Sequence, residues 1–351
     1  EMCIRDRYRL IFKRPGGTSR GVLANKDSWF IILSNADHPE KKGIGECSVI
    51  RGLSPDDRPG IELAVKACCE AFNKTGVLDE KLLAGYPALR FGIETARRDL
   101  KAEKERVLFP SEFTRGGDLI PINGLVWMGD LEFMDRQIRD KLKDGFTCLK
   151  LKIGALDFEA ELDLLKRIRK EYTPAEIELR VDANGAFHPG EALEKLKKLS
   201  EYNIHSIEQP IRQGQLEEMG RLCKLSPLPI ALDEELIGID DPEEKHYLLK
   251  AIKPQYIILK PSLVGGIEKA EEWIHLADQH DIGWWVTSAL ESNIGLNAIA
   301  QWTYTLKSSL PQGLGTGQLF TNNFPSPLFI VKGQLHYNPT INWELNQLFK
   351  G

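Results

Sequence analysis

Charged residues end five consecutive apolar runs in the second half of the sequence. They are Lys150 and Lys152, Asp182, Glu208, Asp233 and Lys260. From Asp182 onward they recur at a near-constant interval of roughly 26 residues, which is close to the length of one strand–helix unit in a barrel enzyme. Because barrel active sites are built at the carboxyl ends of the strands, three acids and three lysines are expected to converge on one mouth.

The three acids are candidate metal ligands. Carboxylates that converge repel one another, and burying them without compensation costs several kcal/mol, so a cation is the natural resolution. Asp182, Glu208 and Asp233 are hard oxygen donors, and no His or Cys stands at an equivalent position. This set favours Mg²⁺ over zinc, with Mn²⁺ able to substitute. The alternative is a purely structural network of salt bridges with the lysines, which the regular spacing makes less favoured.

The lysines are candidate acid–base groups. A lysine acts as a base only if its pKa falls, and a nearby metal, a second lysine and burial all lower it. A base, a metal and a second cation across the barrel suit proton abstraction next to a carboxylate, with the resulting enediolate held by the cations. A rival chemistry is Schiff-base formation by Lys152 or Lys260, as in barrel aldolases, but that chemistry does not need the three acids.

The alternation of side chains along a strand shows which residues share a face with the lysines and acids. Alternate side chains of a strand share a face, so Lys150 and Lys152 point together, as do Arg180, Asp182 and Asn184. The intervening leucines and valine can then pack under helices.

Short apolar runs alternate with charged amphipathic stretches after about residue 120, which is typical of a parallel sheet built from βα units. The predicted strands are residues 122–127, 148–153, 178–182, 204–208, 230–233, 256–260 and 283–288, with a short eighth near 313–317. An open doubly wound sheet is the competing architecture. No GxGxxG or GxxxxGK[ST] motif follows an early strand, so a barrel is favoured.

The sequence predicts three parts. Residues 1–115 are expected to form a separate α+β domain, with strands at 8–12 and 29–33 and helices at 60–73 and 88–104. Residues 116–319 are expected to form the barrel with the active site. Residues 320–351, which are interrupted by prolines, break the βα rhythm and are expected to return to the first domain.

Composition excludes several classes of protein. The 351 residues carry a net charge of −5 with both signs mixed along the chain, so a nucleic-acid partner is not expected. No apolar stretch is long enough for a membrane span, and the first residues are too charged for a signal peptide. A cytoplasmic enzyme acting on a small carboxylate is expected. The sequence predicts no oligomeric state.

The complete pattern resembles the enolase superfamily in its muconate-lactonising subgroup. That subgroup has Lys-x-Lys on the second barrel strand, Asp, Glu and Asp on the next three, and Lys on the sixth. The resemblance implies a (β/α)₇β modified TIM barrel with an α+β capping domain, a metal bound by the three acids, and a lysine base. Here Lys152 takes the place of the base and Lys260 that of the opposing cation.

These motifs do not identify the substrate, because cycloisomerases, dipeptide epimerases and N-succinylamino acid racemases share them. Residues 313–320, GLGTGQLF, lack the Asp-x-Asp that binds the ammonium of a dipeptide, and residues 288–295, SALESNIG, lack a histidine base. Both segments, and PGGTSRG at residues 15–21, resemble the o-succinylbenzoate synthase family. The last is either a mobile lid or an ordinary turn.

That resemblance implies an Mg²⁺-dependent lyase that dehydrates 2-succinyl-6-hydroxy-2,4-cyclohexadiene-1-carboxylate in menaquinone synthesis. The alternatives left open are an N-succinylamino acid racemase, another epimerase or cycloisomerase of the subgroup, and a non-catalytic metal-binding barrel. The substrate-binding candidates are Lys150, Arg180, Asn184, Ser288 and Arg20.

Overall fold

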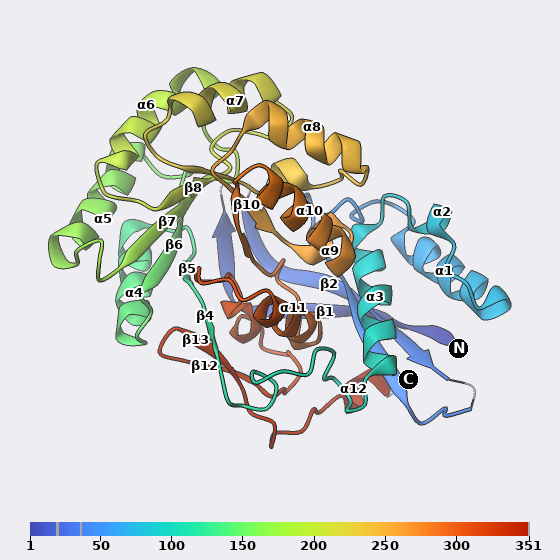
Figure 1. Ribbon diagram of the computed structural model, residues 1–351. Coiled ribbons are helices and arrows are strands. Elements are labelled where there is room, and N and C mark those ends of the chain that lie inside the picture. The colour runs from blue at the N-terminus through green and yellow to red at the C-terminus, as the bar shows by residue number, and fades with distance from the viewer. Residues whose placement is uncertain (19–20, 36, 350–351) are drawn as a thin grey trace.

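The computed structural model describes residues 1–18, 21–35 and 37–349 (Figure 1). An antiparallel sheet with its helices, blue to cyan in Figure 1, lies beside a curled parallel sheet that is surrounded by helices. The prediction of a mixed α/β chain with parallel βα units is confirmed. In the described part of the chain, no helix is both long and apolar enough to cross a membrane.

The first part of the chain is a three-stranded antiparallel sheet backed by helices. Its elements are β1 (Met2–Thr18), β2 (Gly21–Ser34), β3 (Lys42–Val49), α1 (Ile61–Thr75), α2 (Glu80–Leu83) and α3 (Pro87–Lys101). Residues 29–33 of β2 are all buried. Trp29, Ile31 and Leu33 pack among residues of α1 and α3, while Phe30 packs with Phe324 on the opposite face. Both faces of this sheet are therefore covered, which explains the continuous apolar run in β2.

Glycines allow α3 to lie directly on β3. A Cβ atom at Gly45 would come within 1.8 Å of the carbonyl oxygen of Gly92, which is nearer than any real side chain approaches. The helix can pack at this distance only because neither residue carries a side chain.

The second part of the chain alternates strands and helices. Its elements are β5 (Gly124–Val126), α4 (Leu131–Lys143), β6 (Cys148–Lys152), α5 (Phe158–Glu171), β7 (Glu178–Asp182), α6 (Pro189–Ser200), β8 (Ser206–Glu208), α7 (Leu216–Leu225), β9 (Ile230–Leu232), η1 (Glu234–Leu236), α8 (Pro242–Ile252), β10 (Tyr256–Leu259), α9 (Pro261–Val264), α10 (Ile267–Gln279), β11 (Gly283–Val286) and α11 (Asn293–Thr305). The seven strands pair in sequence order from β5 to β11, as the predicted βα rhythm requires. An open sheet with a reversed strand order is not formed.

The prediction of an eighth strand near residues 313–317 is wrong, because no strand forms there in the described structure. Residues 315–318 form a short 3-10 helix, η2 (Gly315–Gln318), and Gln312 and Gly313 make only single parallel bridges. Gly313 bridges to Thr287 after β11, and Gln312 bridges to Ile122 before β5. The three glycines at positions 313, 315 and 317 weaken strand formation, since each lacks a side chain to pack. The two bridges nevertheless connect the ends of the seven-stranded sheet and close the barrel.

The final segment contacts both parts of the molecule. Phe320 bridges to Phe12 of β1, and Leu348 in α12 (Asn346–Phe349) packs with Phe30. Between them, β12 (Leu328–Val331) pairs with β13 (Gln334–Tyr337), which in turn pairs with β4 (Ile120–Pro121). The predicted boundaries of the three parts, at residues 115/116 and 319/320, stay a prediction.

Candidate active site

Parallel register places the predicted site residues side by side. Lys152 of β6 is paired with Asp182 of β7, and Asp182 is paired with Glu208 of β8, each at the carboxyl end of its strand. Asp233 follows β9 and Lys260 follows β10 in the same position. The leucines on either side of Lys150 belong to the hydrophobic core between sheet and helices, so the predicted parity of β6 is confirmed.

Lysines and carboxylates alternate across the mouth of the barrel. Lys150 Nζ lies 3.0 Å from Asp182 Oδ2 and also donates to Glu208, while Lys152 Nζ lies 2.5 Å from Asp182 Oδ2. Lys260 donates to Asp233 and lies 3.6 Å from Glu208 Oε1. Each of the three carboxylates therefore has a lysine close to it.

These neighbours divide the three lysines by proton affinity. Burial lowers the pKa of Lys152, and the charges of Lys150 and Lys260 lower it further against the opposing effect of Asp182. Burial also opposes the charged form of Lys150 and Lys260, but Asp182 and Glu208 outweigh it at Lys150, and Asp233 and Glu208 outweigh it at Lys260. The pKa values of these two lysines are therefore raised. Lys152 is thus the lysine of the three that loses its proton most readily.

The carboxylates fit a hard divalent cation. Burial and the charge of Asp182 raise the pKa of Glu208 to about 8, because Lys150 and Lys260 only partly offset them. Glu208 Oε1 is buried and has no hydrogen-bond donor. Within the described ranges, no group of three or more His, Cys, Asp or Glu side chains is spaced to hold a metal ion. Lysine nitrogens lie between the three acids instead. The donor chemistry nevertheless suits Mg²⁺, which takes carboxylate oxygens.

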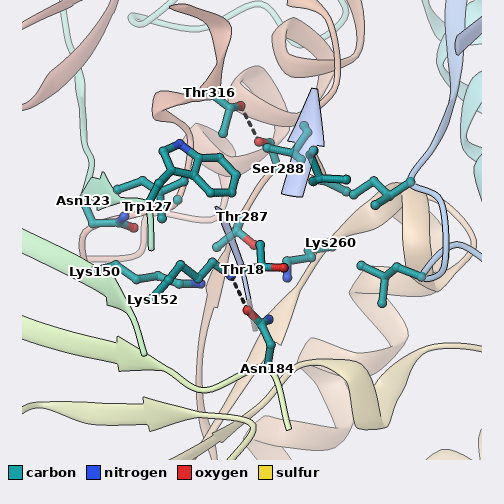
Figure 2. Close-up of a pocket in the computed structure, with 17 residues that line it drawn as sticks. Thr18, Asn123, Trp127, Lys150, Lys152, Asn184, Lys260, Thr287, Ser288 and Thr316 are labelled. Atoms are coloured by element: carbon teal, nitrogen blue, oxygen red, sulfur yellow. Dashed lines mark hydrogen bonds between the residues drawn. The ribbon is translucent and has the colours of Figure 1, made fainter. Parts of the chain in front are cut away.

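A cavity of about 680 Å³, counting the space open at its mouth, lies over these residues (Figure 2). Three groups of residues line the cavity: the lysines Lys150, Lys152 and Lys260; the polar Thr18, Asn123, Asn184, Thr287, Ser288 and Thr316; and the apolar Leu23, Ile50, Leu53, Leu125, Trp127, Ala289, Leu290 and Gly313. Among the described residues that line it, there is no Asp or Glu. Lysine ends therefore face the cavity from below, and an apolar roof comes partly from the antiparallel sheet.

Two predicted substrate contacts lie in the cavity wall. Asn184 Oδ1 accepts a hydrogen bond from Lys152 Nζ at 3.0 Å, and Ser288 Oγ is hydrogen-bonded to Thr316 Oγ1 at 2.5 Å (Figure 2). Lys150 lines the cavity beside them.

The structure places Arg180 away from the lining of the cavity. Its guanidinium donates to Glu178 at 2.7 Å and to the carbonyl of Pro311 at 2.9 Å, and it lies over the ring of Trp285. Its side chain points into the barrel, but it comes one layer deeper than Asp182, so it packs beneath the site. Arg20, the other predicted basic contact, lies outside the described residues.

The hairpin that contains the PGGTSRG segment touches the barrel mouth. Gly17 bridges to Met128 after β5, and a Cβ atom at Gly16 would lie 3.0 Å from the ring of Trp127. Thr18 and Trp127 both line the cavity. Residues 16–18 therefore lie at the mouth of the cavity, and the mobility of the segment stays a prediction.

Sequence reasoning missed two polar residues of the cavity. Asn123 Oδ1 and Thr287 Oγ1 are buried and have no hydrogen-bond partner. Both lie at barrel strand ends, but neither carries a charge that could have singled it out in the sequence. Gln209 was also missed: its side-chain oxygen accepts from the backbone N–H of Asp233 at 3.2 Å and so orients this predicted ligand.

The fold and the site together define a barrel enzyme with three lysines and three carboxylates at the mouth of its barrel. A family model described as Enolase C-terminal domain-like matches residues 134–340. The o-succinylbenzoate synthase of Desulfotalea psychrophila is 49 % identical over 94 % of this chain and 97 % of its own length. This chain belongs to the enolase superfamily.

Solved structures agree with this assignment. The crystal structure of MenC from Desulfotalea psychrophila superposes with a TM-score of 0.80 at 46 % identity, covering 96 % of this chain and 99 % of that one. Muconate lactonizing enzyme from Pseudomonas fluorescens (0.81, 22 % identity, covering 99 % and 97 %) shares the fold. So does dipeptide epimerase from Cytophaga hutchinsonii, solved with Mg and a dipeptide (0.83, 20 %, covering 99 % and 96 %). The predicted (β/α)₇β barrel with a capping domain and the predicted subgroup are confirmed.

Proposed function

We propose that this chain is an o-succinylbenzoate synthase, which dehydrates 2-succinyl-6-hydroxy-2,4-cyclohexadiene-1-carboxylate to o-succinylbenzoate. The observation that carries the proposal is the lining of the cavity, which contains three lysines and, among the described residues, no carboxylate. The substrate is a dianion, so both of its carboxylates find cations there, whereas a substrate ammonium would be buried without a partner at a cost of several kcal/mol. The 49 % identity to the synthase of Desulfotalea psychrophila supports the same choice.

Lys152 is the proposed base. It has the lowered pKa among the three lysines, and Asn184 holds its nitrogen at the cavity. In the proposed reaction Lys152 takes the proton next to the carboxylate. The protonated lysine then donates to the hydroxyl that departs from the same face as water, and the ring becomes aromatic.

Lys260 is the proposed stabilising cation. It lines the cavity from the end of β10, and the three strands that carry or precede the acids, β7, β8 and β9, lie between it and Lys152. Its raised pKa keeps it charged, so it can stabilise the enediolate and lie over the developing aromatic ring. Lys150 assists carboxylate binding and, through its charge, lowers the pKa of Lys152.

Asp182, Glu208 and Asp233 are the proposed ligands of Mg²⁺, with Mn²⁺ as a substitute. When bound there, the cation supplies positive charge that stabilises the substrate carboxylate as charge develops on it. Asn184 and Ser288 are proposed to contact the substrate. The reaction would serve menaquinone synthesis in the cytoplasm.

An N-succinylamino acid racemase is the second candidate, since its substrates also carry a succinyl group and no ammonium. The purified protein with Mg²⁺ is therefore assayed with the cyclohexadiene acid, followed by the absorbance change on aromatisation. N-succinyl amino acids and L-Ala-L-Glu are assayed by exchange of the α-proton for solvent deuterium. We expect the highest kcat/KM for dehydration and background exchange of the dipeptide. Faster exchange of an N-succinyl amino acid than dehydration of the cyclohexadiene acid would favour the racemase.

A further inference from the structure

Buried polar residues join the antiparallel sheet to the barrel just outside the cavity. The charged members of this junction are Lys26 on β2, Glu46 on β3 and Glu291 in the turn after β11. Glu46 and Glu291 are completely buried, and Lys26 is only 5 % exposed. Buried charges are costly unless they are paired and hydrogen-bonded, so such a cluster calls for an explanation. The proposed reaction uses none of the three.

Glu291 connects two segments of the cavity wall. Its Oε1 accepts from the hydroxyl of Ser262 at 2.5 Å, and its Oε2 accepts from the backbone N–H of Ala289 at 2.7 Å. Ser262 comes two residues after Lys260, and Ala289 comes directly after Ser288. Lys260 and Ser288 both face the cavity (Figure 2). One carboxylate therefore ties together the ends of two neighbouring strands that carry site residues.

Glu46 holds the adjacent residues from the side of the antiparallel sheet. Its two oxygens accept from the backbone N–H groups of Ser292 and Gly295, each at 3.0 Å, and from the Ser292 hydroxyl at 2.5 Å. The Ser28 hydroxyl also donates to it, at 2.7 Å. Glu46 thus fixes the start of α11, immediately after Glu291. A Cβ atom at Gly295 would lie 2.9 Å from Glu46 Oε2 and 2.8 Å from Glu291 Cβ, which shows how closely the two acids are packed.

The turn between these contacts has an unfavourable backbone. Leu290 has a φ of +61°, a left-handed conformation that costs a residue with a side chain about 1–2 kcal/mol. Such a conformation persists only where the surroundings hold it. The bonds to Glu291 on one side and to Glu46 on the other supply that restraint. Leu290 and Ala289 are themselves part of the cavity wall.

We infer that Glu291 is a positioning residue, which sets Lys260 and Ser288 relative to one another, and that Glu46 lets the antiparallel sheet hold the same turn. A shift of about 1 Å at a reacting group is enough to lower a rate by up to 10²-fold. Loss of the Glu291 contacts should therefore lower kcat while Lys152 and the metal ligands stay in place. The inference rests on the proposed function for its kinetic readout alone.

The kinetic test compares three variants of the full chain with a matched control. Glu291→Ala and Ser262→Ala each break the connection, and we expect kcat for dehydration to fall about tenfold or more, with KM within about threefold. Glu291→Gln should retain most of the activity, because its oxygen can accept from Ala289 while its amide nitrogen donates to Ser262. The control is Ser48→Ala, which removes an equally buried serine that bonds to Lys26 in the same junction but does not touch Glu291. It should leave kcat unchanged.

A second readout needs no substrate. Amide hydrogen exchange across residues 289–295 should be about tenfold faster in Glu291→Ala and Ser262→Ala, and near the wild-type rate in Glu291→Gln and Ser48→Ala. If Glu291→Ala does not fold, the kcat and the exchange rates of Ser262→Ala test the positioning role. Unchanged kcat and unchanged local exchange in a folded connection-breaking variant would overturn the inference. So would an equal loss in the serine control. A wild-type protein that does not dehydrate the cyclohexadiene acid refutes the proposed function instead, and the exchange experiment still decides the positioning role.

Discussion

Asn184 Oδ1 accepts a hydrogen bond from Lys152 Nζ at 3.0 Å, while its amide nitrogen donates to Glu234 at 3.0 Å. This second bond fixes which end of the amide faces the lysine. The backbone N–H of Asn184 donates to Asp182 Oδ1 at 2.9 Å, and its φ of +46° lies in the left-handed region, which Asn tolerates better than most residues. Asn184 thus links the direction of the proposed base to a proposed metal ligand.

Two substitutions separate the side chain of Asn184 from its backbone. Asn184→Gly and Asn184→Ala both remove the amide, so we expect a similar loss of kcat in the two variants, about tenfold or more. The left-handed conformation costs alanine about 1 kcal/mol and glycine nothing, so only Asn184→Ala should lose that additional stability. Steady-state kinetics and urea unfolding provide the two measurements. Wild-type kcat in the glycine variant would mean that Asn184 does not orient Lys152.

Removal of the proposed base should nearly abolish turnover. General-base catalysis contributes about 10²–10⁴-fold, and Lys152→Ala should lose at least the lower figure in kcat. The Mg²⁺ affinity, measured by titration calorimetry, should stay within a few-fold, since no ligand is removed. Retention of more than about a tenth of the wild-type kcat, equivalent to about 1.4 kcal/mol, would assign the base elsewhere.

Chelation with EDTA should abolish dehydration, and Mg²⁺ or Mn²⁺ should restore it. Glu208→Gln keeps the shape of the ligand but removes its charge, so we expect Mg²⁺ affinity to fall at least about tenfold. Glu272→Gln is the control, because Glu272 pairs with Lys245 away from the cavity. Full activity of metal-free protein, or equal affinity in the two variants, would contradict the assignment of the three acids.

Stability should depend on pH through Asp56. Its completely buried carboxylate accepts from the backbone N–H groups of Ala88 and Leu89 at the start of α3. Burial nevertheless raises its pKa from 3.8 to about 6. The folded state therefore binds this proton more tightly than the unfolded state, so the stabilisation is complete below about pH 4 and disappears as the pH rises through about 6.

Lowering the pH from 7 to 5 should therefore let Asp56 add about 1 kcal/mol to the free energy of unfolding. Asp56→Asn removes the titrating group, so the difference between wild type and variant should change by this amount across the range. Urea unfolding at both pH values measures it. A difference that does not vary with pH would show that Asp56 is ionised throughout the range.

Much of the site was predictable because strand geometry is regular. The parity of β6 sends Lys150 and Lys152 to one face, and the parallel register then aligns Lys152, Asp182 and the next acid along the sheet. Spacing along the chain was therefore enough to bring the six charged residues together. The lysines pair directly with the acids, as the salt-bridge alternative expects. Glu208 Oε1 accepts no hydrogen bond, as the metal interpretation expects.

Depth along a strand was less predictable than direction. Arg180 shares its face with Asp182, but two residues of strand correspond to about 6.6 Å, which places it below the cavity. Asn123 and Thr287 line the cavity but were not predicted, because uncharged residues at strand ends resemble ordinary loop residues in a sequence. The bond between Glu46 and Ser292 joins residues far apart in the chain, so no local pattern could reveal it.

The closure of the barrel through Gln312 and Gly313 has an evolutionary consequence. Four backbone hydrogen bonds join these two residues to the segments on either side, and the side-chain oxygen of Gln312 also accepts from the backbone N–H of Val286 at 2.7 Å. The next residues form η2 rather than a strand, so they are free of the alternation that constrains β6 or β7. Substitutions there can reshape the substrate side of the cavity, as at Thr316, without reversing the faces of a strand. New specificities can therefore arise at this seam while the catalytic lysines and acids stay fixed.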